Sequence, residues 1–202
     1  VLGPHINESG VYFEVNKQGE IRFGLGAIKG AGDAAVQAII QERDANGIYQ
    51  DIFDLTKRLS AKSVTKKTYE CLAQSGAFDC FEGIHRRQYV YAREGDTSLI
   101  EKAMRYAAKT QQEELSSQVS LFGGGATVAL PKPKIETLEP FSEIEKLNLE
   151  KEVVGIYISG HPLDNFKFEL ESFTNLTCQQ LNDIEPLLGK EAKVGGIISS
   201  VE

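Results

Sequence analysis

Residues Gly24–Glu42 decide the fold, and they read G-L-G-A-I-K-G-A-G-D-A-A-V-Q-A-I-I-Q-E. A short apolar segment leads into Gly30 and Gly32, and a helical pattern follows in which Asp33 is placed to cap the helix. Apolar residues four positions apart give that helix one buried face, formed by Ala35, Val36, Ile39 and Ile40. Because glycine adopts positive φ without strain, the stretch predicts a tight turn between two short helices.

The predicted turn suits an anion. Its glycines carry no side chains, so backbone N–H groups at the N-terminus of the second helix can approach a phosphate. This order of apolar, glycine and small residues resembles the helix-hairpin-helix family, which grips DNA through its phosphates. The resemblance implies DNA contacts at Lys29, Gly30, Ala31 and Gly32. The alternative is a glycine-rich turn that only allows two helices to pack.

The composition is that of a soluble globular chain of 202 residues, long enough for one or two domains. No apolar run reaches membrane-spanning length and no signal peptide opens the chain, so we expect no membrane partner. Cysteines and histidines are few and scattered, which indicates reduced thiols, a cytoplasmic location and no metal site. They are Cys71, Cys80 and Cys178, with His5, His85 and His161.

The net charge of −7 is unevenly distributed. Residues 1–93 hold 12 basic and 11 acidic side chains, a net charge of +1, whereas residues 94–202 carry −8. The segment 57–67 has five basic residues and no acid, namely Lys57, Arg58, Lys62, Lys66 and Lys67. We therefore expect any nucleic-acid contact in the first half of the chain. The alternative for the basic segment is a solvated helix face.

Turn and capping signals predict the other elements. A β-hairpin, Val11–Val15 with Ile21–Phe23, precedes the glycine stretch. A helix over Asp51–Leu59, a break over Ser60–Val64 and a Thr65-capped helix ending before Gly76 resemble a second, degenerate hairpin. It lacks Gly-x-Gly, so its phosphate contacts would rely on side chains. Those side chains are Lys62, Lys66 and Lys67.

Two capping boxes predict the later helices. Ser98 with Glu101 opens a helix expected to reach about Glu114, after a short helix that starts near His85. Ser142 with Glu145 opens a helix expected to reach Ser159. A short helix over 163–172 and a strand beginning at Lys193 follow. Because a single terminal strand has no partner here, the chain is interpreted as an excised piece that ends as a β domain begins.

Residues 116–140 are predicted to form an exposed loop without packed structure of its own. Within it, Gln118, Leu121 and Phe122 form a Gln-x-x-Leu-Phe pattern that resembles the peptide by which bacterial proteins bind the sliding clamp. Apolar residues in a polar, glycine-bounded segment suit a partner's pocket, with the glutamine amide at the rim. Val119 stands where this family often has leucine. The alternative is that Leu121 and Phe122 pack onto their own domain.

Four stretches together resemble the C-family polymerases, the bacterial replicative DNA polymerase III alpha subunits. They are I-R-F-G-L-G-A-I-K-G-A-G (21–32), S-G-A-F-D (75–79), Q-V-S-L-F (118–122) and E-K-E-V-V-G-I-Y-I-S-G-H-P-L-D (150–164). The resemblance implies duplex DNA, the sliding clamp and other replisome subunits as partners. It also implies a mainly α fold, a tandem helix-hairpin-helix domain with a small N-terminal β-hairpin and the first strand of a truncated OB-fold.

The implied domains follow the chain in order. They are the end of the fingers domain (1–23), the helix-hairpin-helix domain with following helices (24–115), the clamp-binding loop (116–140), a helical connector (141–188) and the start of an OB-fold (189–202). The chain has no Asp-x-Asp pair, and two-metal phosphoryl transfer needs clustered carboxylates. We therefore expect no catalytic residue and no cofactor in this piece, with magnesium in the parent polymerase, a DNA-directed nucleotidyltransferase.

Two other functions fit the same sequence. One is a free-standing helix-hairpin-helix DNA-binding adaptor of repair or recombination. The other is a protein-interaction scaffold in which the hairpin glycines only pack. Acidic catalytic motifs several hundred residues upstream in the parent gene would distinguish the polymerase from the free-standing adaptor.

Overall fold

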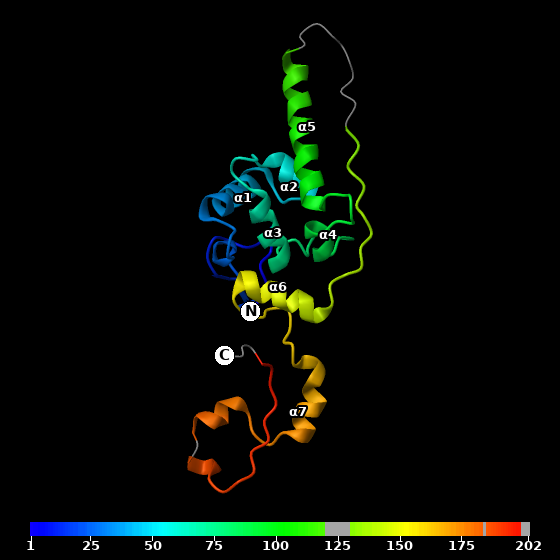
Figure 1. The fold of residues 1–202 in the computed structure, drawn as a ribbon. Helices are drawn as coiled ribbons and strands as arrows, with labels where there is room; N and C mark the ends of the chain where they lie inside the picture. Colours follow the sequence, from blue (N-terminus) through cyan, green and yellow to red (C-terminus); the bar gives the residue numbers. More distant parts are fainter. Residues whose placement is uncertain (120–129, 184, 199–202) are drawn as a thin grey trace. The chain divides into compact units, whose positions relative to one another are not determined.

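The computed structural model describes residues 1–119, 130–183 and 185–198 (Figure 1). Two compact units divide the chain, residues 1–159 and 160–202. The first unit contains β1 (Glu14–Val15), β2 (Ile21–Arg22), the 3₁₀ helix η1 (Leu25–Ala27), α1 (Asp33–Asn46), α2 (Ile52–Arg58), α3 (Lys66–Ser75), α4 (Arg86–Val90), α5 (Leu99–Val119) and α6 (Glu143–Val154). The second contains η2 (Asp164–Phe166), α7 (Lys167–Phe173), η3 (Cys178–Asn182) and η4 (Glu185–Leu187). The prediction of a mainly helical fold with one small hairpin is confirmed.

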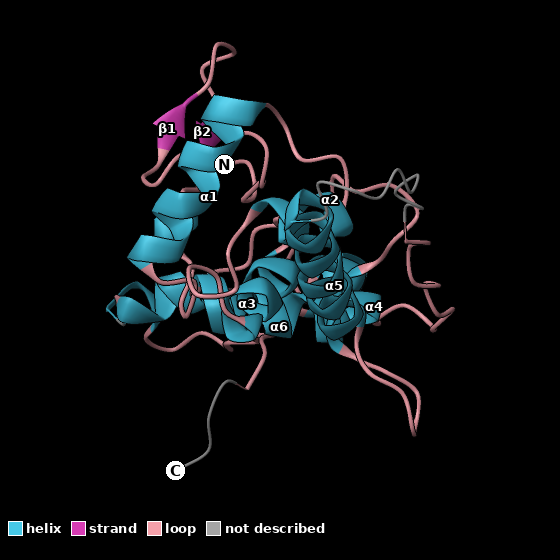
Figure 2. Cartoon of the chain, turned by 90° about the horizontal axis from the view of Figure 1, so that it is seen from above, coloured by secondary structure: helices cyan, strands magenta, loops and turns pink. Residues whose placement is uncertain are grey.

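Helix packing builds the core of the first unit. In both views α2 lies along α5, and α3 lies against α6 (Figures 1 and 2). The largest fully buried side chains come from every part of the unit and include Ile6, Leu25, Ile39, Tyr49, Leu55, Leu72, Phe78, Tyr89 and Ile100. Short elements that are each unstable in isolation therefore share one apolar core.

Capping chemistry places most helix starts where the sequence predicted them. Asp51 accepts a hydrogen bond from the Asp54 amide at 2.8 Å, and Thr65 accepts one from the Thr68 amide. Ser142 and Glu145 form the predicted reciprocal capping box at α6. Gly76, with φ 89°, ends α3 in the left-handed conformation.

Several boundaries differ from the predictions. The strands of the hairpin are shorter than expected, at Glu14–Val15 and Ile21–Arg22. Helix α5 continues to Val119, so residues 116–119 are helical rather than the start of the expected loop. Helix α6 ends earlier than Ser159, because Gly155 adopts φ 89° at its C-cap. Residues 193–198 form no strand, and among the described residues the only two-stranded sheet is β1 with β2. A strand needs a neighbouring strand for its backbone hydrogen bonds, and residue 193 instead contacts Asn175 through its carbonyl.

Residues 130–141, here called the strap, correct the prediction of a loop without packed structure. The strap runs past α5 and α4 in extended form (Figure 1). Three side chains from or near α4 contact three consecutive backbone carbonyls of the strap. Gln88 donates a hydrogen bond to the carbonyl of residue 136 at 2.8 Å, and Arg93 donates one to the carbonyl of residue 137 at 2.8 Å. A ring nitrogen of His85 lies 2.8 Å from the carbonyl oxygen of residue 138. Near the strap's start, the Tyr106 hydroxyl donates to the Leu130 carbonyl at 3.3 Å. The strap is thus fixed to the helical unit through its backbone.

A buried ion pair joins α6 to α4. Glu150 is 1% exposed, and its Oε1 lies 3.2 Å from a guanidinium nitrogen of Arg86, itself 8% exposed. The other carboxylate oxygen accepts the amides of Ile158 and Ser159 at 2.8 and 2.9 Å. Desolvation alone would lower the pKa of Arg86, but the carboxylates of Asp79, 2.6 Å away, and Glu150 raise it above its ordinary value. The Glu150 carboxylate therefore links α6 to the start of α4 and to residues 158–159.

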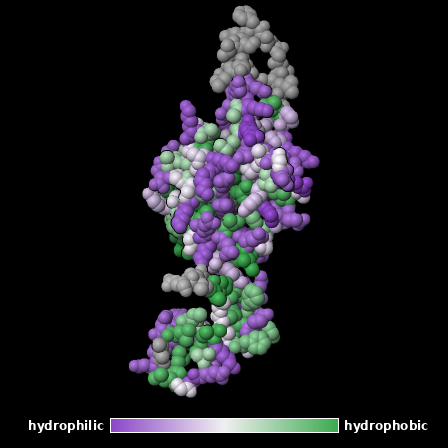
Figure 3. Space-filling view, viewed as in Figure 1, coloured by the Kyte–Doolittle hydropathy of each residue, from purple (hydrophilic) through white to green (hydrophobic). Residues whose placement is uncertain are grey.

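The second unit buries little of its own apolar surface. Its exposed large apolar side chains include Phe166, Phe168, Phe173, Leu188 and Ile198. Figure 3 shows hydrophobic atoms over much of the visible face of this unit, in contrast to the largely hydrophilic face of the first. None of the helices in the described ranges combines the length and apolar character needed to cross a bilayer.

Candidate nucleic-acid interface

The turn between η1 and α1 has the predicted backbone conformation. Gly30 and Gly32 have φ values of 81° and 78°, in the region that favours glycine. The predicted cap is wrong by one residue, because Gly32 is the N-cap and Asp33 is the first residue of α1. Gly32 offers no side chain to the first amides of α1, so they lack the usual capping partner. The helix N-terminus therefore presents N–H groups and the positive end of its dipole.

Two other helices hold this turn in place. The Thr68 hydroxyl of α3 donates to the Ala31 carbonyl at 3.1 Å. On the α6 side, the Lys29 amide donates to the Val153 carbonyl at 2.8 Å, so this amide is already occupied. A Cβ at Gly30 would lie 2.8 Å from the Cys71 Sγ, a thiol whose pKa is raised by burial. A side chain at residue 30 would thus collide with α3.

The structure brings some of the predicted lysines to the turn and leaves others away from it. The Cε atom of Lys67 lies 4.0 Å from the position of a Cβ at Gly30, so α3 carries this charge beside the glycines. Lys29 is exposed within the turn itself. In the described part of the chain, neither Lys29, Lys62 nor Lys67 forms an ion pair. These positive charges remain available to an anion.

Lys66 differs from its neighbour. Its ammonium lies 2.5 Å from Glu101 on α5 and 3.7 Å from Glu70 on α3. The hydrogen bond with Glu101 raises the pKa of Lys66 above its ordinary value. Because two carboxylates already balance its charge, Lys66 is the weakest of the predicted phosphate contacts.

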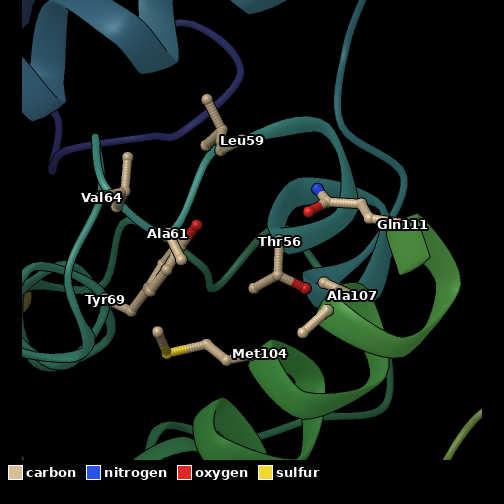
Figure 4. A pocket seen from close by; sticks show the side chains of 9 residues that line it. Thr56, Leu59, Ala61, Val64, Tyr69, Met104, Ala107 and Gln111 are labelled. Atoms are coloured by element: carbon tan, nitrogen blue, oxygen red, sulfur yellow. The ribbon is translucent and has the colours of Figure 1, made fainter. Parts of the chain in front are cut away.

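The second hairpin joins α2 to α3 without the special backbone of the first. Within the described residues, no non-glycine residue has positive φ, so residues 59–65 form their turn in ordinary conformations. A small cavity of about 30 Å³, lined by Thr56, Leu59, Val64, Tyr69, Met104 and neighbouring residues, lies between this hairpin and α5 (Figure 4). That volume suits roughly one water molecule and no larger ligand. The second hairpin therefore supports the first mainly through packing.

Comparison with known proteins agrees with this geometry. A family model described as a helix-hairpin-helix motif matches residues 1–89. DNA polymerase III subunit alpha of Haemophilus influenzae is 32% identical over 98% of the chain, and that of Deinococcus radiodurans is 39% identical over the whole chain. The corresponding protein of Buchnera aphidicola from Acyrthosiphon pisum is 35% identical, again over the whole chain. The chain belongs to the DNA polymerase III alpha-subunit family.

The chain spans 16%, 17% and 15% of the lengths of the Haemophilus, Buchnera and Deinococcus alpha subunits. In the described residues of this alpha-subunit region, no group of three or more histidine, cysteine or acidic side chains could hold a metal ion. Asp51 caps α2 and pairs with Lys132 at 2.5 Å. Desolvation would raise the pKa of Asp51, but its hydrogen bonds with Lys132 and the Asp54 amide lower it overall.

The predicted clamp-binding residues of the alpha-subunit region fall at the edge of the described structure. Gln118 belongs to the last turn of α5, where only the backbone is described. Leu121 and Phe122 lie outside the described residues. Helix α5 and the strap, which bracket this segment, are both fixed to the helical unit.

Sequence reasoning missed two features of this alpha-subunit region. Arg105 and Lys109 are exposed basic side chains on α5, within residues 94–202, whose net charge is −8. Their spacing of four within a predicted helix was the available signal. Arg86 and Glu150 were also missed, and their pairing over 64 positions left no local pattern to find.

Proposed function

We propose that this alpha-subunit region holds duplex DNA behind a polymerase active site that lies elsewhere in the parent protein. The observation that carries the proposal is the uncapped N-terminus of α1 behind Gly30 and Gly32, with Lys67 beside it. Backbone amides and lysines read phosphates rather than bases, so binding is sequence-independent. The excess of acidic residues in the whole chain makes the affinity weak, in the high micromolar range or poorer.

The parent protein, on this proposal, is a cytoplasmic DNA-directed DNA polymerase that uses magnesium and works with other replisome subunits. A free-standing adaptor of repair or recombination is less well supported. Relatives named as alpha subunits match 98% to 100% of the chain, not only its hairpin segment. A protein-interaction scaffold that does not bind DNA would not explain why the N-terminus of α1 is uncapped and lies beside Lys67.

The duplex-binding proposal is tested by Gly32→Ala against Gly47→Ala. Both glycines have positive φ, 78° and 85°, at opposite ends of α1, and a Cβ at either position meets no atom within 4 Å. Each substitution therefore costs similar stability, about 1–3 kcal/mol, through backbone strain alone. Only the Cβ at residue 32 stands before the amides that would hold a phosphate. We expect Gly32→Ala to weaken binding to a labelled duplex at least fivefold by fluorescence anisotropy, and Gly47→Ala to leave it unchanged.

Equal duplex affinities for Gly32→Ala and Gly47→Ala would show that the turn does not contact DNA. A second measurement supports the assignment to phosphates. Duplex affinity must fall with added salt by a similar factor for unrelated sequences, because counterion release is independent of sequence. Strong preference for one sequence contradicts the proposed mode.

We further propose that Gln118, Leu121 and Phe122 bind the sliding clamp. Ordering a segment rich in glycine and serine costs entropy, and burial of two large apolar side chains in a preformed pocket offsets it. Burial of two such side chains contributes about 3–6 kcal/mol before that cost, so micromolar affinity is expected. The several pockets of a ring, together with the DNA contact, then add avidity.

The clamp proposal is tested by the double substitution Leu121→Ala with Phe122→Ala. We expect the variant to lose detectable binding to the cognate clamp in surface plasmon resonance, with an unchanged melting temperature. Val128→Ala is the matched control, since it removes an apolar side chain from the same segment outside the pattern. A melting temperature several degrees lower, with no clamp binding by the parent chain, would show that both residues belong to the core.

A further inference from the structure

A groove between α5 and the strap has an apolar floor and a positively charged rim. Its volume is about 330 Å³, which is in the range of small-ligand sites. Tyr106 and the strap residues Leu130, Pro131 and Pro133 supply its apolar lining, here called the floor, and Arg105 and Lys109 supply charged lining, here called the rim. All of these residues belong to the first unit. The groove lies apart from the Gly30–Gly32 turn in sequence and in the elements that build it.

The rim charges are free to meet an anion. In the described part of the chain, Arg105 and Lys109 form no ion pair. Asp96 and Glu101 interact electrostatically with Arg105 without pairing with it, since Asp96 pairs with Lys102 at 2.5 Å and Glu101 pairs with Lys66. Lys102 also lines the groove, but its charge is balanced by Asp96 and, at 3.9 Å, by Glu136. In the described residues, Arg105 and Lys109 therefore remain without an ion-pair partner of their own.

The floor is fixed in shape. Tyr106 packs edge-on against Phe53 at a centroid distance of 5.6 Å and donates its hydroxyl hydrogen to the Leu130 carbonyl. Beyond the groove, Lys132 pairs with Asp51 and so ties this part of the strap to the start of α2. Proline adds rings with a fixed backbone φ at residues 131 and 133. A preformed apolar floor lowers the ordering cost of a ligand.

We propose that this groove binds single-stranded DNA, with phosphates on Arg105 and Lys109 and a sugar or base over the floor. Single-strand sites combine a basic groove with flat side chains on which bases rest, and they need no sequence readout. Arg105 and Lys109 are one helical turn apart, about 6 Å along α5, so both can face the backbone of one strand. The choice of DNA over an acidic peptide rests on the duplex-binding function proposed above. The contact itself is separate from the hairpin.

The test uses a double variant that carries both Arg105→Gln and Lys109→Gln. The control variant carries Lys17→Gln, on the β-hairpin turn. Binding of a labelled 12-nucleotide thymidine strand to the full chain is followed by fluorescence anisotropy at low salt. We expect the double variant to bind at least tenfold more weakly and its slope of log affinity against log salt to fall by about 1.4, because two phosphate contacts are lost. Lys17→Gln removes one positive charge outside the groove. It should therefore change the strand affinity and the salt slope much less than the double variant does.

Two outcomes overturn the proposal: unchanged single-strand affinity in the double variant, or equally tight, groove-dependent binding of a glutamate peptide of matched length. The second outcome would make the groove an acidic-peptide site. Duplex binding separates this proposal from that of the hairpin. Gly32→Ala should weaken duplex binding and leave the strand affinity unchanged, and the groove variant should do the reverse. If only one of these two expected results is obtained, the surface changed in the other variant is the one that was assigned wrongly.

Discussion

Glu150→Ala should destabilise the first unit by about 3–5 kcal/mol, because it leaves the buried Arg86 guanidinium without one of its two carboxylates. The same substitution removes the acceptor of the Ile158 and Ser159 amides. Chemical denaturation followed by circular dichroism measures the loss. Hydrogen exchange at residues 158 and 159 should accelerate more than exchange elsewhere in the unit, because these amides lose their only described partner.

Asp79→Ala is the matched control, because it removes the other carboxylate bound to Arg86. The side chain of Asp79 is 49% exposed, so water replaces it, and the cost should be near 1 kcal/mol. Replacing both buried partners, Glu150→Met with Arg86→Met, should recover part of the loss since neither charge then stays unpaired. Equal costs for Glu150→Ala and Asp79→Ala would contradict the burial argument.

Gly30→Ala should be the second severe substitution, with a loss of about 2–4 kcal/mol. Two causes add: a side chain at φ 81° costs about 1–3 kcal/mol, and the new Cβ would lie 2.8 Å from the Cys71 Sγ. Cys71 is 1% exposed and cannot swing into solvent. Thermal unfolding monitored by circular dichroism measures the combined effect.

A double-mutant cycle separates the two causes of the Gly30→Ala loss. Cys71→Ala removes the colliding sulfur, so Gly30→Ala should cost less in that background than in the natural chain. The remaining cost should equal that of Gly32→Ala, where φ is also positive but the space is open. A cost that is the same in both backgrounds would show that the thiol does not obstruct residue 30.

Local chemistry explains which parts of the fold were predictable. Asp51, Thr65 and Ser142 cap helices through hydrogen bonds within three or four residues, so short patterns reveal them. The positive φ values at Gly30 and Gly32 follow from the same local logic. At the predicted DNA contacts, the sequence could predict the conformation of the turn, because glycine is the residue that adopts positive φ without strain.

The features that sequence did not predict depend on distant partners. Nothing local in the sequence marks Glu150 as buried, because its partner Arg86 lies 64 residues away. The involvement of Lys66 with Glu101 is equally non-local, at 35 residues. The strap was predicted as loose because its contacts use main-chain carbonyls, which every residue type supplies alike.

The carbonyl contacts of the strap have a practical consequence for labelling the molecule. Since Gln88, Arg93 and His85 bind backbone oxygens, the side chains at residues 136–138 can be exchanged without removing those three contacts. Thr137 is exposed, so a cysteine there would carry a fluorophore or spin label at a position fixed by the backbone. Once the exposed Cys178 is replaced by serine, such a reporter would register release of the strap from Arg93 while the lining of the α5 groove stays unmodified.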